Sequence, residues 1–68
     1  MLTANQEKVL NSIKFYYRMF GDSPSIRDIG ELCNIRSTNT VHKHLQILKQ
    51  KGYISIENSK ARAIRLLA

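Results

Sequence analysis

The chain has 68 residues, of which 43% are hydrophobic and 24% charged, with a net charge of +6. This balance is typical of a folded domain and argues against a disordered segment. The length allows one small domain, with little room for an enclosed active site. Cys33 is the single cysteine, which excludes an internal disulfide, and no apolar run approaches the roughly 20 residues that cross a bilayer, so we expect a cytoplasmic protein.

The first predicted element is a helix over about residues 4–20. Thr3, followed three residues later by Gln6, is a capping-box pattern for its start, and Gly21 is suited to end it. Apolar side chains recur at helical spacing, and we expect this stripe to face the core: Val9, Leu10, Ile13, Tyr16, Tyr17 and Phe20.

A second, short helix is predicted over about residues 26–33. Ser25 is suited to cap it, and Asp28 falls in its first turn, where a negative charge is favourable. The residue after this helix is Asn34, which tolerates the left-handed backbone of a tight turn. We expect the buried face of the helix to be formed by Ile29, Leu32 and Cys33.

The third helix is predicted to begin after a cap at Ser37 and to run to about Lys51, before Gly52. Only Asn34, Ile35 and Arg36 separate the cap of this helix from the second helix. Two helices joined by a turn of about three residues are typical of a helix-turn-helix, whose second helix enters the major groove of DNA.

The remaining residues predict a β-hairpin. Residues 53–56 and 62–66 are rich in strand-forming residues, with a polar tip between them. We therefore expect an α+β, mainly helical fold over residues 1–68: a winged helix-turn-helix, with three helices followed by a two-stranded hairpin.

The third helix has two distinct faces. Val41, Leu45 and Leu48 cluster on one side, which must face the core. The opposite side and its flank carry no acid, and their amides and hydroxyls can donate and accept hydrogen bonds, as reading base edges requires. The alternative to DNA contact is that this side is only a solvated helix face. The residues concerned are Asn39, Thr40, His42, Lys43, Gln46 and Gln50.

The charge is unevenly placed along the chain. Residues 1–34 contain four basic and four acidic residues, whereas residues 35–68 contain seven basic residues and only Glu57 as an acid. A one-sided basic field is expected of a protein that binds phosphates. We expect Arg27, Arg36 and Lys49 to reach DNA phosphates beside the groove. The hairpin tip, with Asn58, Ser59 and Lys60 and with Arg62 behind it, is expected to lie over the adjacent backbone or the minor groove.

Four segments, in this order and at this spacing, resemble the N-terminal DNA-binding domain of the LexA repressors: SPSIRDIGE, STNTVHKHLQIL, KGYI and RAIRLL. The resemblance covers nearly the whole chain. It implies a repressor of DNA-damage (SOS) response genes that binds palindromic operators as a dimer. The run from Thr40 to Leu45 is more similar to the branch of the family that reads GAAC…GTTC half-sites than to the branch that reads CTGT…ACAG half-sites.

The resemblance also implies roles for residues. It places base contacts on Ser37, Asn39, Thr40, His42 and Lys43, and backbone contacts at the start of the second helix, where Ser25 lies, and on the hairpin. The chain departs from the family in having Asn34 where a glycine is usual. The family's self-cleaving half, which supplies dimerisation, has no counterpart in these residues, so we expect either an excised domain or a standalone regulator.

Other functions find less support in the sequence. We expect no enzyme, because no constellation has a burial or oxyanion rationale, and no cofactor. We also expect no metal, because His42 and His44 point about 200° apart on a helix and cannot share one ion with Cys33.

The alternative to DNA binding is a protein-interaction winged helix, in which the third helix contacts a protein partner. Double-stranded DNA, bound by two copies in the nucleoid, is the partner we expect.

Overall fold

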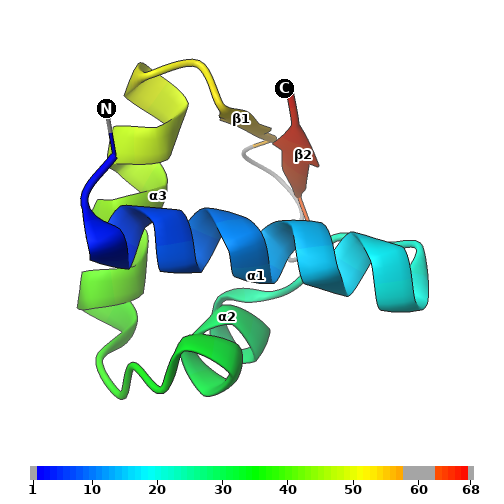
Figure 1. The fold of residues 1–68 in the computed structure, drawn as a ribbon, viewed down its shortest axis with the longest axis horizontal. Helices are drawn as coiled ribbons and strands as arrows, with labels where there is room; N and C mark the ends of the chain where they lie inside the picture. The colour runs from blue at the N-terminus through cyan, green and yellow to red at the C-terminus, as the bar shows by residue number, and fades with distance from the viewer. Residues whose placement is uncertain (1, 58–62, 68) are drawn as a thin grey trace.

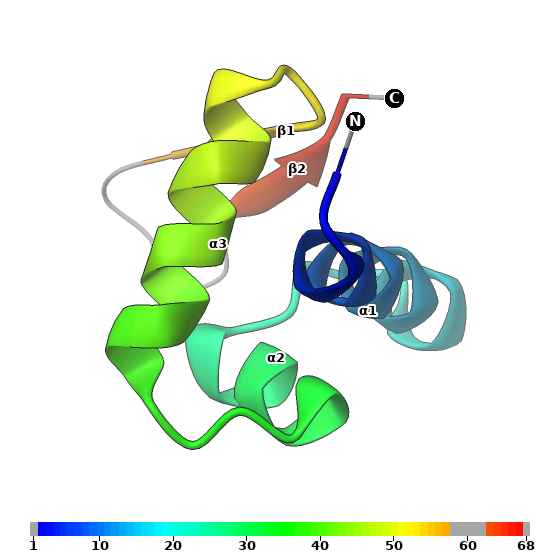
Figure 2. The same cartoon turned by 60° about the vertical axis from the view of Figure 1, so that its left-hand side comes forward.

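The structure is a computed structural model that describes residues 2–57 and 63–67. Three helices, α1 (Ala4–Phe20), α2 (Ile26–Cys33) and α3 (Thr38–Gln50), precede two strands, β1 (Ile54–Ile56) and β2 (Ile64–Leu66). The strands pair antiparallel, with Ile56 opposite Ile64 and Ile54 opposite Leu66. The helices surround a shared centre, and the strands lie at the opposite end of the molecule from α2 (Figures 1 and 2). The predicted winged helix-turn-helix is confirmed.

The helices begin where side chains can accept the first free amides. The Gln6 amide donates to Thr3 Oγ1 at 3.2 Å, and the Thr3 amide donates back to Gln6 Oε1 at 3.0 Å. A second capping box joins Ser25 and Asp28 by two bonds of 2.9 and 3.1 Å, so Asp28 does more than place a charge in the first turn. These reciprocal bonds fix both helix starts.

The turn between α2 and α3 is closed by backbone hydrogen bonds. Asn34 has φ of 56°, as its position predicted. The Ile35 amide donates to the Gly30 carbonyl at 2.8 Å, and the Asn34 amide donates to the Glu31 carbonyl at 3.3 Å, which is the bond pair of a Schellman motif. A Cβ on Gly30 would lie 2.9 Å from the Ile35 carbonyl oxygen. The absence of a side chain there allows the chain to turn this tightly.

One core joins all five elements. Val41, Leu45 and Leu48 of α3 are at most 2% exposed, which confirms the predicted inward face of that helix. They pack with buried residues of α1, α2 and the strands: Val9, Leu10, Ile13, Ile29, Cys33, Ile54 and Ile64. Because α3 contacts α1, α2 and β1, burial on three sides sets its rotation about its own axis.

Two predicted core residues are exposed. Phe20 is 65% exposed, and its ring lies against Tyr16 with centroids 4.6 Å apart. Leu32 is 44% exposed, because the short α2 meets the core through Ile29 and Cys33, and Leu32 falls at the edge of that face. The predictions for Phe20 and Leu32 were wrong.

The strands are shorter than predicted. Tyr53 precedes β1, and Ala63 precedes β2. Arg62, the predicted first residue of the second strand, lies outside the described residues.

We expect Gly30→Ala to lower the free energy of unfolding by about 1–3 kcal/mol, the usual range for overpacking. At an open helical position the same change would raise stability by roughly 0.5–1 kcal/mol, so the sign reports the contact with Ile35. Urea titration measures the difference. Asn11→Ala, at an exposed position of α1, is the control, and a more stable Gly30→Ala variant would contradict the proposed close approach.

Candidate nucleic-acid interface

The polar face of α3 is open to solvent over its whole length. Each of the six residues predicted for this face and its flank is exposed: Asn39, Thr40, His42, Lys43, Gln46 and Gln50. No acidic residue occurs between Thr38 and Gln50. The face therefore offers hydrogen-bond donors and acceptors together with positive charge, and nothing on it repels a phosphate.

The start of α3 concentrates these groups. Ser37 is the cap, and its Oγ accepts from the Thr40 amide at 3.4 Å. The first backbone bond of the helix runs from the Val41 amide to the Ser37 carbonyl, so the Thr38 and Asn39 amides precede the helical bonding pattern. Such amides are suited to an anion.

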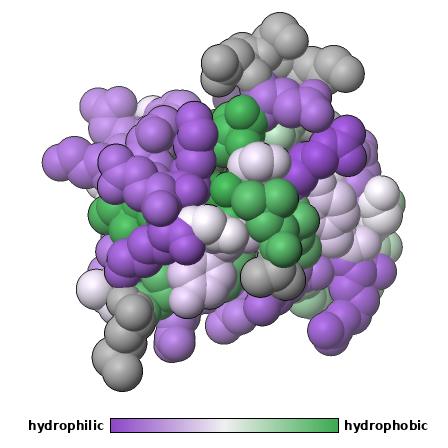
Figure 3. Space-filling view, turned by 90° about the horizontal axis from the view of Figure 1, so that it is seen from above, coloured by the Kyte–Doolittle hydropathy of each residue, from purple (hydrophilic) through white to green (hydrophobic). Residues whose placement is uncertain are grey.

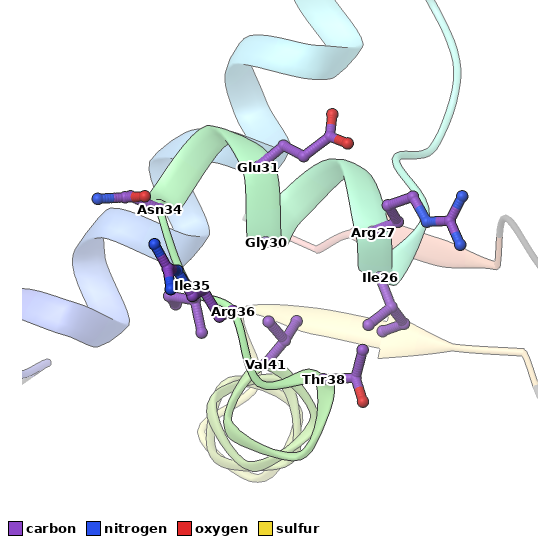
Figure 4. A pocket seen from close by; sticks show the side chains of 9 residues that line it. All are labelled: Ile26, Arg27, Gly30, Glu31, Asn34, Ile35, Arg36, Thr38 and Val41. Atoms are coloured by element: carbon purple, nitrogen blue, oxygen red, sulfur yellow. The ribbon is translucent and has the colours of Figure 1, made fainter.

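A groove of about 380 Å³ lies between α2 and α3. Figure 4 shows Arg27 and Arg36 at its two ends, while the Glu31 side chain points away from α3. Its apolar wall is formed by Ile26, Ile35 and Val41. Arg27 and Arg36, nine residues apart in the sequence, thus flank one concave surface beside the start of α3, and their predicted contacts with phosphates stay a prediction.

Thr38 belongs to this surface and was missed at the sequence level. It is the first residue of α3, it is exposed, and it lines the groove. Its position directly after the Ser37 cap was the available signal. Lys49 lies apart from this cluster, in the last turn of α3, about 15 Å along the axis from Asn39 at the helical rise.

The basic half of the chain contains one acid, and that acid is paired. Arg65 Nε lies 3.2 Å from Glu57 Oε1, across the hairpin. An exposed pair of this kind adds little stability, but it offsets the charge of Glu57 in the hairpin of β1 and β2, which is the wing of this fold. Figure 3, a view from above Figure 1, shows hydrophilic side chains on the side where α3 lies, next to a hydrophobic band. The predicted tip contacts at Asn58, Ser59, Lys60 and Arg62 lie outside the described residues.

The two histidines of α3 have different surroundings. His42 is exposed, whereas His44 is half-buried, and its buried Nδ1 has no hydrogen-bond partner in the described part of the chain. Among residues 2–57 and 63–67, no three His, Cys, Asp or Glu side chains gather as metal ligands would. The helices of the same residues include none with the length and apolar character that spanning a bilayer requires.

Comparison with known proteins shows the family of this chain. The family model of the LexA DNA binding domain matches residues 1–63. The chain belongs to this family. The predicted resemblance to LexA repressors is therefore confirmed, and DNA binding is the property for which the family is named.

Individual LexA repressors align along almost all of the chain. The LexA repressor of Staphylococcus aureus strain N315 is 43% identical over 67 residues, which are 98% of this chain and 32% of that protein. The Desulforamulus reducens repressor is 43% identical over 98% of this chain and 31% of its own length. The Halalkalibacterium halodurans repressor is 44% identical over 97% of this chain and 32% of its own length. The chain spans about a third of the length of the curated relatives it matches.

The groove arginines of this LexA-family domain give a test of phosphate contact. We expect Arg36→Ala to weaken binding to every duplex and to reduce the slope of log affinity against log salt concentration by about 0.9, the contribution of one neutralised phosphate. Fluorescence anisotropy at several salt concentrations measures the slope. Lys14→Ala, which removes an exposed charge from the middle of α1, is the matched control. An unchanged slope for Arg36→Ala would remove Arg36 from the interface.

Proposed function

We propose that this chain binds double-stranded DNA sequence-specifically and represses transcription in the manner of LexA. The observation that carries the proposal is the exposed, acid-free polar face of α3, opposite the buried Val41, Leu45 and Leu48. Three further features support it: the groove flanked by two arginines, the one-sided basic charge, and membership in the LexA DNA binding domain family.

In this proposal the first half of α3 reads bases. Asn39 offers an amide suited to the paired donor and acceptor of adenine, and Lys43 offers donors suited to guanine. His42 lies between them along the helix, and Ser37 and Thr40 add hydroxyls at its start. A recognition helix docks by its N-terminal residues, so Gln46 and Gln50 contribute less.

The backbone contacts would come from elements around this helix. Ser25 Oγ already accepts from the Asp28 amide, and its hydroxyl hydrogen remains suited to donate to a phosphate. Arg27 and Arg36 would contact phosphates from the two ends of the groove. Such contacts fix the position of the protein on the duplex and carry most of its salt dependence. The proposed backbone set is completed by Lys49, Asn58, Ser59, Lys60 and Arg62.

We propose a palindromic operator bound by two copies, with α3 of each copy in successive major grooves. Symmetry then requires half-sites about 34–36 Å apart, or a multiple of that. Repression follows from occlusion of the promoter in the nucleoid. The two copies would be joined by weak self-association or by segments corresponding to the remaining two-thirds of the relatives.

Selection from a random duplex pool tests this function. We expect enrichment of two inverted half-sites whose centres lie one helical turn apart, of the GAAC…GTTC type. Binding would be salt-dependent on every sequence. Failure to bind any duplex at low salt would overturn the proposal and favour a protein partner for α3.

Base reading by Asn39 is tested by Asn39→Ala. We expect a loss of about 1–3 kcal/mol at one base position, with relaxed preference there. Competition against operators substituted at each position measures it. Gln50→Ala, an amide at the far end of the same face, should change the profile little. An equal loss on all sequences would show that Asn39 contacts only the backbone.

A further inference from the structure

The strand β2 is held at one point by side chains from a distant part of the chain. The Ile64 amide donates to Ser23 Oγ at 3.0 Å, and the Ile64 carbonyl accepts a hydrogen bond from the Tyr17 hydroxyl. Tyr17 belongs to α1, and Ser23 to the segment between α1 and α2. Both backbone groups of one strand residue are thus bonded by side chains from 41 to 47 residues away.

These bonds give hydrogen-bond partners to backbone groups at the outer edge of β2. In a two-stranded sheet, each strand has an outer row of amide and carbonyl groups without a neighbouring strand. Leaving such groups buried and unpaired is costly. Ile64 is 4% exposed and Ser23 is 3% exposed, so the bond from the Ile64 amide is made away from water. The Ser23 and Tyr17 side chains therefore make the two hydrogen bonds to Ile64 that the backbone of a third strand would otherwise make.

The position of Ile64 in the hairpin gives these bonds a functional meaning. Ile64 pairs with Ile56, and this pair is the one nearest the tip. The backbone amide of Glu57 also donates to the Ala63 carbonyl at 3.0 Å. The anchored residue Ile64 therefore lies close in sequence to the residues proposed to make the hairpin contacts. The anchor thus holds β2 at the end of the sheet that is nearer the tip.

Ser23 also connects this anchor to α2. Its hydroxyl donates to the Pro24 carbonyl at 3.1 Å, and the next residue, Ser25, is the cap of α2. Pro24 is fully buried. The start of α2 and the base of the wing, two elements proposed to contact the DNA backbone, are therefore joined through one buried serine.

We propose that Tyr17 and Ser23 are positioning residues for DNA binding: they hold β2 and the start of α2 in one fixed relation to α3, so that the backbone contacts proposed for the hairpin and for α2 can form on one duplex. Neither residue contacts DNA in this proposal. The inference rests on the proposed function and adds to it two residues remote from α3.

The test uses Tyr17→Phe, which removes only a hydroxyl, and Ser23→Ala. We expect each variant to bind operator and random duplex roughly three- to tenfold more weakly and to lose about one unit of the salt slope, as after loss of one phosphate contact. Base preference should stay unchanged. Tyr53→Phe, at a half-buried tyrosine at the other end of the hairpin, is the control and should bind as the unaltered chain does.

A double-mutant cycle separates positioning from stability. If the anchor acts through the wing, Tyr17→Phe should cost little further affinity in a Lys60→Ala background. Loss of global stability alone would lower the folded fraction, leave the salt slope unchanged, and add to the effect of Lys60→Ala. An unchanged slope together with additive losses would overturn the proposal.

Hydrogen exchange reports the anchor without DNA. The Ile64 amide should exchange faster in Ser23→Ala than in the unaltered chain, and an unchanged rate would overturn the inference. Failure of the unaltered chain to bind any duplex would overturn the proposed function and this inference together. Binding by the unaltered chain, with wild-type slopes in both variants, would overturn the inference alone.

Discussion

The close approach of Gly30 and Ile35 is the constraint on which the interface depends. The carbonyl oxygen of Ile35 lies 2.9 Å from the position that a Cβ on Gly30 would take, and the Ile35 amide donates to the Gly30 carbonyl. Asn34 adopts the left-handed backbone that this path needs. Because only three residues link α2 to the cap of α3, this contact sets the distance and angle between the helices, and with them the shape of the groove that the two arginines flank.

The core then sets which face of α3 is turned outward, the face proposed to meet DNA. Burying Val41, Leu45 and Leu48 stabilises the fold by about 1.5–3 kcal/mol for each side chain. A rotation of α3 by one residue position, about 100°, would expose part of that set and turn His42 toward the interior. Burial of such a group without a partner is costly. The outward direction of the polar face is therefore a consequence of packing, and the residues proposed to read bases need no contact with the core to be held in place.

Sequence patterns predicted the features that depend on neighbouring residues. Helix limits followed from caps at Thr3, Ser25 and Ser37, and the buried face of α3 followed from its periodicity. Periodicity could not show that packing ends before Phe20, because that depends on how far other elements extend. The bonds of Tyr17 and Ser23 to Ile64 were also beyond local patterns, since they join positions more than 40 residues apart. Of the candidate site, the exposed face of α3 was predictable, whereas the groove required the angle between two helices.

The apolar core and the polar anchor support different parts of DNA recognition. The core orients α3, whose side chains are proposed to distinguish bases, while the hydrogen bonds at Ile64 and Pro24 hold β2 and the start of α2, the elements beside the proposed phosphate contacts. Phosphate contacts determine where along the groove a recognition helix sits, and base contacts determine which sequence it prefers. A small domain has few contacts of either kind, so each must form without a further ordering cost. In the proposed model, holding β2 and the start of α2 by bonds that form in the absence of DNA lowers that cost, and it uses no side chain of the polar face of α3.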